Sequence, residues 1–240
     1  MNVTPLADLL SREFSEWPSL PADCWVRRAI ERNHGGFEIG TAVEAALFLG
    51  LDAAIAARLR LEHPSGRPHH SQHDDGILNA FTEIEAIAWA SQIAQLGAPE
   101  FVNVEGAPDL RISDTHWIEA KTIRSSDRDR NAWEEARQQA AGTNSRPIRS
   151  GAGRGADPQV VMKFEAYYQN AFTKWKRQNC ALGYVVFYCL ERVDADMDRE
   201  GVWEMVTEWV KFRKTHTPEI RLIVIDNHRW GDPMIDSHLL

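Results

Sequence analysis

The chain has 240 residues and a formal net charge of −8, with 43% hydrophobic and 26% charged residues. This composition is that of a folded globular protein and excludes wholesale disorder or a fibrous repeat. No apolar run approaches the roughly 20 residues that cross a bilayer, and the first twenty residues carry acids and prolines where a secretory signal would be basic and then apolar, so we expect a cytoplasmic protein without membrane contact.

The first 75 residues are predicted to form a helical extension and a connector. Apolar spacing predicts helices through Leu6–Leu10, Trp25–Ile30 and Ala42–Leu61. The segment His63–Asp75 contains Pro, Gly, Ser and several His residues without a periodic apolar face, which is typical of an exposed connector. Its histidines match no standard zinc spacing, so we expect them to be solvated. We therefore divide the chain into residues 1–75 and a larger unit, residues 76–240.

From Ile77 onward the pattern predicts alternating helices and strands. A helix from about Ile77 to Leu96 ends at Gly97, a residue that favours the helix C-terminus. The elements expected after it are the strands Glu100–Glu105, Asp109–Ser113 and His116–Ile123, the helices Asn131–Ala141 and Pro158–Gln178, the strand Gly183–Leu190, the helix Val202–Lys214 and the strand Arg221–Asp226. This order predicts an α/β sandwich, with a mixed central sheet flanked by helices.

The predicted hairpin between residues 108 and 121 carries the most informative side chains. If Ser113–Thr115 form the turn, Asp109 lies opposite Glu119. Because side chains alternate along a strand, Asp109, Glu119 and Lys121 then share one face, and the apolar residues share the other. Opposed carboxylates repel each other unless a cation lies between them.

Mg²⁺ is the natural cation for such a pair, because it binds oxygen ligands and keeps several waters. Asp109 and Glu119 are the candidate ligands, and the main-chain carbonyl of Ala120 lies between them in the sequence. Lys121 would face the metal-bound water. There it could orient that water or stabilise charge on a scissile phosphate.

The helix before the hairpin contributes a further candidate. At about 100° per residue, its apolar residues from Ile77 to Trp89 form one stripe, and Glu85 falls inside that stripe. Glu83 falls on the opposite side with Asn79 and Ala90, where we expect solvent. A carboxylate on a buried side needs a partner, so Glu85 is the acid that we expect to face the body of the fold.

Together these residues resemble the PD-(D/E)xK nuclease superfamily, which has the restriction-endonuclease-like fold. The resemblance is carried by Glu85, by the pair Pro108-Asp109 and by the triplet Glu119-Ala120-Lys121, and it leaves the first sixty to seventy residues uncovered. It implies an αβββαβ core and hydrolysis of phosphodiester bonds. It further implies that Asp109 and Glu119 bind Mg²⁺ or Mn²⁺, that Glu85 completes the metal shell, and that Lys121 assists the attacking water.

Positive charge is concentrated in one part of this acidic chain. Residues 121–177 contain twelve Lys and Arg residues against six Asp and Glu residues. Cations that can pair with phosphates are the candidates for nucleic-acid binding. They are Arg124, Arg146, Arg149, Arg154, Lys163 and Lys174. A solvated surface loop and helix is the alternative interpretation of the same residues.

The sequence thus predicts a Mg²⁺-dependent phosphodiesterase, an endonuclease rather than an exonuclease, that acts on DNA in restriction, phage defence or repair. The net charge of −8 opposes binding of a polyanion, which leaves three alternatives: local positive charge suffices, the chain binds as a homo-oligomer, or a protein partner bound through the N-terminal helices delivers the substrate. The alternative is a non-catalytic nucleic-acid-binding or assembly subunit with a nuclease-like fold. In a third interpretation, the chain is an assembly protein whose acidic N-terminal helices bind another protein, and the hairpin acids are surface residues.

Overall fold

The computed structural model describes residues 4–22, 24–32, 43, 46–64, 71–93, 95–123, 158–178, 182–189, 199–226 and 234–240. Its helices are α1 (Pro5–Glu13), α2 (Trp25–Glu31), α4 (Asp52–Glu62), α5 (Ser71–Ala88), α7 (Pro158–Gln178) and α8 (Arg199–His216), with the short turns η1 (Trp17–Ser19) and η2 (Trp89–Ile93). Its strands are β1 (Glu100–Phe101), β2 (Leu110–Arg111), β3 (His116–Ile123), β4 (Leu182–Cys189), β5 (Ile220–Asp226) and β6 (Met234–Asp236).

The strands form one six-stranded sheet in the order β1-β2-β3-β4-β5-β6. The first three strands are an antiparallel meander, β3, β4 and β5 are parallel, and β6 is antiparallel to β5. This confirms the predicted α/β class with a mixed sheet, to which β6 is an unpredicted addition. The hairpin has the predicted register, since Leu110 pairs with Ile118 and Arg111 with Trp117.

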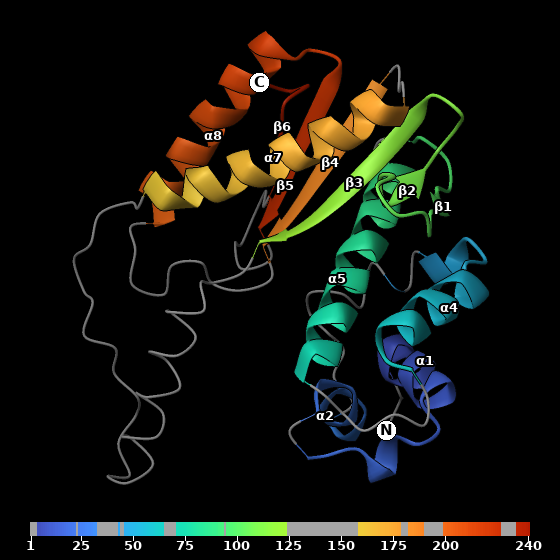
Figure 1. The fold of residues 1–240 in the computed structure, drawn as a ribbon. Coiled ribbons are helices and arrows are strands. Elements are labelled where there is room, and N and C mark those ends of the chain that lie inside the picture. The colour runs from blue at the N-terminus through green and yellow to red at the C-terminus, as the bar shows by residue number, and fades with distance from the viewer. Residues whose placement is uncertain are drawn as a thin grey trace, which may run out of the picture.

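Helices cover both faces of this sheet (Figure 1). On one face, α7 and α8 pack their buried residues, among them Phe164, Tyr168 and Trp209, against Val185 and Leu222 of the parallel strands. On the other face, the end of α5 and the turn η2 pack against β3, β4 and β5 through a second apolar cluster. That cluster contains Ala86, Ile87, Trp89, Ile118, Tyr184 and Ile223.

The N-terminal helices pack against the first half of α5, on the side away from the sheet (Figure 1). There Ile77, Phe81 and Ile84 of α5 share a core with residues of α1, α2 and α4. α5 therefore has two covered faces, one toward the N-terminal helices and one toward the sheet. This double coverage decides which of its acids reaches the site.

The segment between α4 and α5 corrects one expectation. Residues 71–75, expected in an exposed connector, belong to α5, so the predicted division between residues 75 and 76 falls inside this helix. His63, expected to be solvated, is 1% exposed and lies edge-on to Phe14 with 5.3 Å between the ring centroids. The apolar ring of Phe14 gives His63 a buried environment that its polar sequence neighbours did not indicate.

The expected helix Asn131–Ala141 and the arginine-bearing loop after it lie outside the described residues. The helix α7, in contrast, has the predicted bounds, and Gly97 after η2 has a φ of +85°, the left-handed conformation that glycine adopts readily at a helix end. Within the described part of the chain, no helix is long and apolar enough to cross a membrane.

Candidate active site

The site lies where β2 stops pairing with β3. β2 pairs only through Leu110 and Arg111, so the β3 edge from Glu119 onward has no strand beside it among those described. The side chain of Asp109, just before β2, replaces the missing strand: its Oδ2 accepts the main-chain N–H of Ala120 at 2.9 Å. Satisfying a strand-edge donor with a carboxylate leaves the other oxygen of Asp109 available to the site.

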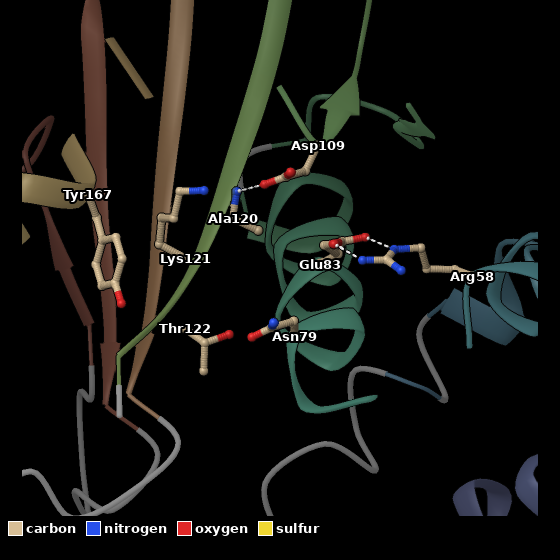
Figure 2. A pocket seen from close by; sticks show the side chains of 8 residues that line it. All are labelled: Arg58, Asn79, Glu83, Asp109, Ala120, Lys121, Thr122 and Tyr167. Carbon is tan, nitrogen blue, oxygen red and sulfur yellow. Dashed lines mark hydrogen bonds and ion pairs between the residues drawn. The ribbon is translucent and has the colours of Figure 1, made fainter. Parts of the chain in front are cut away.

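A pocket of about 310 Å³ opens at this edge, and its walls come from four elements (Figure 2). Its lining residues are Arg58 of α4, Asn79 and Glu83 of α5, Asp109, the β3 residues Ala120, Lys121 and Thr122, and Tyr167 of α7. A second cavity of about 300 Å³, between α4 and residues 102–105, shares Arg58, Glu83 and Asp109 with the first. The candidate site is therefore a junction of both helical layers with the hairpin.

Glu119 is the most buried charged group of the site, with an exposed fraction of 0%. Its Oε1 accepts a hydrogen bond from Lys174 Nζ at 2.6 Å and also pairs with Lys121. Lys174 Nζ is in addition 3.7 Å from Oδ1 of Asp109. The ammonium of Lys174 thus lies within ion-pair distance of both predicted metal-binding carboxylates.

Burial governs the ionisation of this cluster. It raises the pKa of Glu119, the charge of Asp109 raises it further, and Lys121 and Lys174 oppose both effects. Burial disfavours the charged form of Lys121, but the neighbouring carboxylates of Glu119, Asp109 and Glu83 outweigh it and raise the pKa of this lysine. Lys121 is therefore an ammonium at neutral pH, so it can donate hydrogen bonds and stabilise negative charge but cannot act as a general base.

The α5 acid in the pocket is Glu83, and the prediction that Glu83 is solvated was wrong. Glu83 is 8% exposed, whereas Glu85 is half-buried and does not line the pocket. The apolar stripe that contains Glu85 packs on the N-terminal helices, and the opposite side of α5, with Asn79 and Glu83, faces the sheet. The helical spacing correctly places the two acids on different sides of α5. It does not show that the N-terminal helices cover one side and the sheet covers the other.

Glu83 is held by Arg58 of the N-terminal helix α4 (Figure 2). Arg58 Nε donates to Glu83 Oε2 at 2.6 Å, Arg58 Nη2 donates to Oε1 at 2.7 Å, and Arg58 also pairs with Glu62. Burial raises the pKa of Glu83 to about 7, although Arg58 lowers it, and Asp109 adds a repulsive contribution. No motif singled out Arg58 beforehand, because its partner is 25 residues away in the sequence.

The donor set around Asp109 and Glu119 fits a hard divalent cation. Carboxylate oxygens are the preferred ligands of Mg²⁺ and Mn²⁺, and Oε2 of Glu119 is buried without a hydrogen-bond partner among the described residues. A buried, unsatisfied carboxylate oxygen is costly, and an ion is one of its usual partners. The described residues contain no group of three or more Asp, Glu, His or Cys side chains that gathers as a metal site. Water and substrate oxygens would therefore complete the shell.

The predicted nucleic-acid-binding residues fall into two sets. Arg124, Arg146, Arg149 and Arg154 lie outside the described residues. Lys163 and Lys174 both belong to α7, and Lys174 reaches the acids themselves. The main-chain N–H of Ala120 bonds to Asp109, and binding of a metal by the Ala120 carbonyl stays a prediction.

Comparison of the chain with protein-family models, with curated proteins and with solved structures finds no match. Assignment of a function to this site therefore depends on the chemistry of its own residues.

Proposed function

We propose that this protein is a metal-dependent nuclease that hydrolyses phosphodiester bonds of nucleic acid, with DNA as the first substrate to test. One observation carries the proposal: Asp109, Glu119 and Lys121 meet at an open strand edge beside a pocket, with one oxygen of the buried Glu119 unsatisfied among the described residues. Two opposed carboxylates repel each other unless a cation compensates them. A metal-dependent phosphodiesterase site uses such a pair to hold its cation.

The roles follow from the geometry and charge of each group. Asp109 and Glu119 would hold Mg²⁺ or Mn²⁺, which supplies Lewis-acid activation of water and of the phosphate when bound. Lys121 is charged, lines the pocket and pairs with Glu119, so its ammonium can orient an attacking water or stabilise negative charge on the phosphate. Glu83, with its pKa of about 7, can accept a proton inside the pocket near neutral pH.

One partly exposed side of α7 favours a polyanionic substrate. Lys163, Tyr167, Asn170, Lys174 and Arg177 recur at intervals of four and three residues, and therefore lie along one side of the helix. The acid of α7, Glu165, lies on the other side, where it accepts hydrogen bonds from Trp209 and Arg213 of α8. The side of α7 that carries Lys163, Tyr167 and Lys174 adjoins the pocket through Tyr167. It adjoins the two acids Asp109 and Glu119 through Lys174.

Phosphate groups pair with such a cationic side, and an exposed aromatic ring can stack on a base. This side of α7 thereby supplies local positive charge in a chain whose net charge is −8. The resemblance to the PD-(D/E)xK superfamily supports the same proposal, because the order α5-β1-β2-β3-α7-β4 agrees with the αβββαβ core that it implies. We accordingly propose a restriction-endonuclease-like fold for this part of the chain.

The test is a cleavage assay with supercoiled plasmid, linear single-stranded DNA and RNA, each with Mg²⁺, Mn²⁺ or EDTA. We expect metal-dependent cleavage that falls at least about 100-fold in Glu119→Gln. Glu100→Gln is the matched control, because Glu100 belongs to the same meander but pairs with Arg111 at the surface. Nicking of closed circular plasmid would identify an endonuclease.

Two results would contradict the proposal. One is a folded wild-type chain that cleaves none of these substrates with any metal. The other is cleavage that survives unchanged in Glu119→Gln, which would place the activity outside this site or in a contaminant. The first result would favour the alternative of a nucleic-acid-binding or assembly subunit.

A further inference from the structure

The ammonium of Lys174 occupies the position at which the charges of two carboxylates converge. Lys174 lies in the last turns of α7, 55 residues from Glu119 in the sequence, yet its Nζ is 2.6 Å from Oε1 of Glu119 and 3.7 Å from Oδ1 of Asp109. Its side chain is 21% exposed. This contact joins the α7 layer to the hairpin.

The charge balance shows what this ammonium does. When both acids are ionised, Asp109 and Glu119 together carry two negative charges, and Lys121 and Lys174 supply two positive charges within ion-pair distance of them. These four groups are therefore neutral without a metal. A divalent cation added to them would leave two uncompensated positive charges in a largely buried site, which is unfavourable. Displacement of an ammonium would therefore favour binding of such a cation at these acids.

Lys174 is the ammonium that can leave more easily. Lys121 is part of β3, whose residues 116–123 are all paired with β4, and it pairs with the Glu119 two positions before it. Lys174 instead reaches the acids from a separate layer on a flexible stem. Its neighbours on the same side of α7, Tyr167, Asn170 and Arg177, are exposed, so a path to solvent leads along that side.

We propose that Lys174 is an internal counter-cation of the site: it competes with the divalent metal for Asp109 and Glu119, and once displaced its ammonium is available to a substrate phosphate. This inference rests on the proposed function. It also implies that metal and nucleic acid favour each other, because a phosphate that attracts Lys174 frees the carboxylates for the metal. Such coupling is reciprocal, so each ligand strengthens binding of the other.

The test is Mn²⁺ affinity of the full chain without nucleic acid, measured by titration calorimetry and by the electron paramagnetic resonance signal of free Mn²⁺. Lys174→Met removes the ammonium and keeps an apolar stem, and we expect it to bind Mn²⁺ about tenfold more tightly than wild type. Lys176→Met is the matched control, because Lys176 Nζ lies 4.3 Å from the centroid of the Phe172 ring, away from the acids. Its affinity should stay within about twofold of wild type.

Two further measurements check that the variant is folded and test the coupling between Mn²⁺ and nucleic acid. Thermal unfolding should show a larger Mn²⁺-induced rise in Tm for Lys174→Met than for wild type, since the variant has one carboxylate charge that no ammonium compensates. A phosphorothioate oligonucleotide, used as a slowly cleaved probe, should tighten Mn²⁺ binding of wild type several-fold more than that of Lys174→Met, in which only contact between substrate oxygens and the metal couples the two ligands.

Each outcome separates this inference from the proposed function. If wild type cleaves DNA but Lys174→Met binds Mn²⁺ no more tightly, the inference is wrong and the nuclease proposal stands. If Lys174→Met binds Mn²⁺ and wild type neither binds nor cleaves, the competition is supported and the native chain is a non-catalytic relative. If neither protein binds a metal at millimolar concentration, both proposals fail.

Discussion

Arg58 of α4 and Glu83 of α5 form a two-bond ion pair, with hydrogen bonds of 2.6 and 2.7 Å, inside the candidate active site. Their side chains are only 14% and 10% exposed. The N-terminal helices therefore share a core with α5 and also supply the partner of an acid in the pocket. A chain truncated before α5 would lose both.

Arg58→Met is expected to lower the free energy of unfolding by about 3 kcal/mol at pH 8, because removing one partner of a buried pair leaves the other charge without compensation. The measurement is urea unfolding followed by circular dichroism. Arg12→Met is the control: Arg12 and Asp8 form a surface pair with side chains 52% and 58% exposed, and its loss should cost less than about 0.5 kcal/mol. Equal effects of the two substitutions would show that the Arg58 pair adds nothing to stability.

A comparison of Glu83→Gln with Glu85→Gln tests which acid of α5 serves the site. Glu83 lines the pocket and interacts electrostatically with Asp109, whereas Glu85 does not line it. We expect Glu83→Gln to reduce metal-dependent cleavage about 10- to 100-fold, and Glu85→Gln to change it less than about threefold. If Glu85→Gln instead reduces cleavage more than Glu83→Gln does, Glu85 is the acid that serves the site, as the sequence pattern predicts.

The features of the fold that the sequence predicts correctly depend on patterns within short stretches of the chain. The hairpin register followed from a turn and from alternating side chains within residues 108–121, and Leu110 does pair with Ile118. The ends of α7 followed from helical spacing. The mixed sheet followed from the order of helices and strands. These features need no knowledge of distant partners.

The unpredicted features depend on contacts between distant segments. Helical periodicity places Glu83 and Glu85 on different sides of α5, but it does not tell how many sides are covered by neighbours. Arg58 enters the pocket from a helix that the family resemblance does not cover. Lys174 was recognised as a cation of α7, but only the packing of α7 across β3 brings it to Glu119. Sequence spacing therefore brings Asp109, Glu119 and Lys121 together at the hairpin, but it does not bring Arg58, Glu83 and Lys174 to them.

The raised pKa of Glu83 predicts how stability depends on pH. This pKa is about 7 in the folded protein against an ordinary value of 4.5, so the folded state binds the proton more tightly than the unfolded state. The contribution of Glu83 to stability is therefore complete below about pH 4.5 and is lost as the pH rises through 7. Wild type should lose up to about 3 kcal/mol from this group relative to Glu83→Gln, which does not titrate.

Urea unfolding of wild type and Glu83→Gln at pH 5, 6, 7 and 8 measures this dependence as the difference between the two proteins. Glu165→Gln serves as the control. Burial acts to raise the pKa of Glu165, but hydrogen bonds led by that from Arg213 outweigh it and leave this pKa lowered. The contribution of Glu165 is therefore constant above pH 5, and its difference from wild type should be flat. A flat difference for Glu83→Gln as well would contradict the raised pKa.

Asp109 has two separable tasks, since one of its oxygens accepts the N–H of Ala120 at 2.9 Å and the other lies 3.7 Å from the ammonium of Lys174. Asp109→Asn keeps an oxygen acceptor for Ala120 and removes the charge, so we expect a stable protein, within about 1 kcal/mol of wild type, that neither binds Mn²⁺ tightly nor cleaves. Asp109→Ala removes the acceptor as well and should cost about 1–2 kcal/mol of stability in addition.

Hydrogen exchange of the Ala120 amide, followed by NMR, distinguishes the two variants directly. Protection of this amide should persist in Asp109→Asn and fall in Asp109→Ala, because the strand edge of β3 then has no acceptor at this position. Equal protection in both variants would mean that another group caps the edge, and Asp109 would keep only its electrostatic task. Loss of cleavage in Asp109→Asn with the amide still protected would assign the lost activity to the missing charge rather than to a disturbed hairpin.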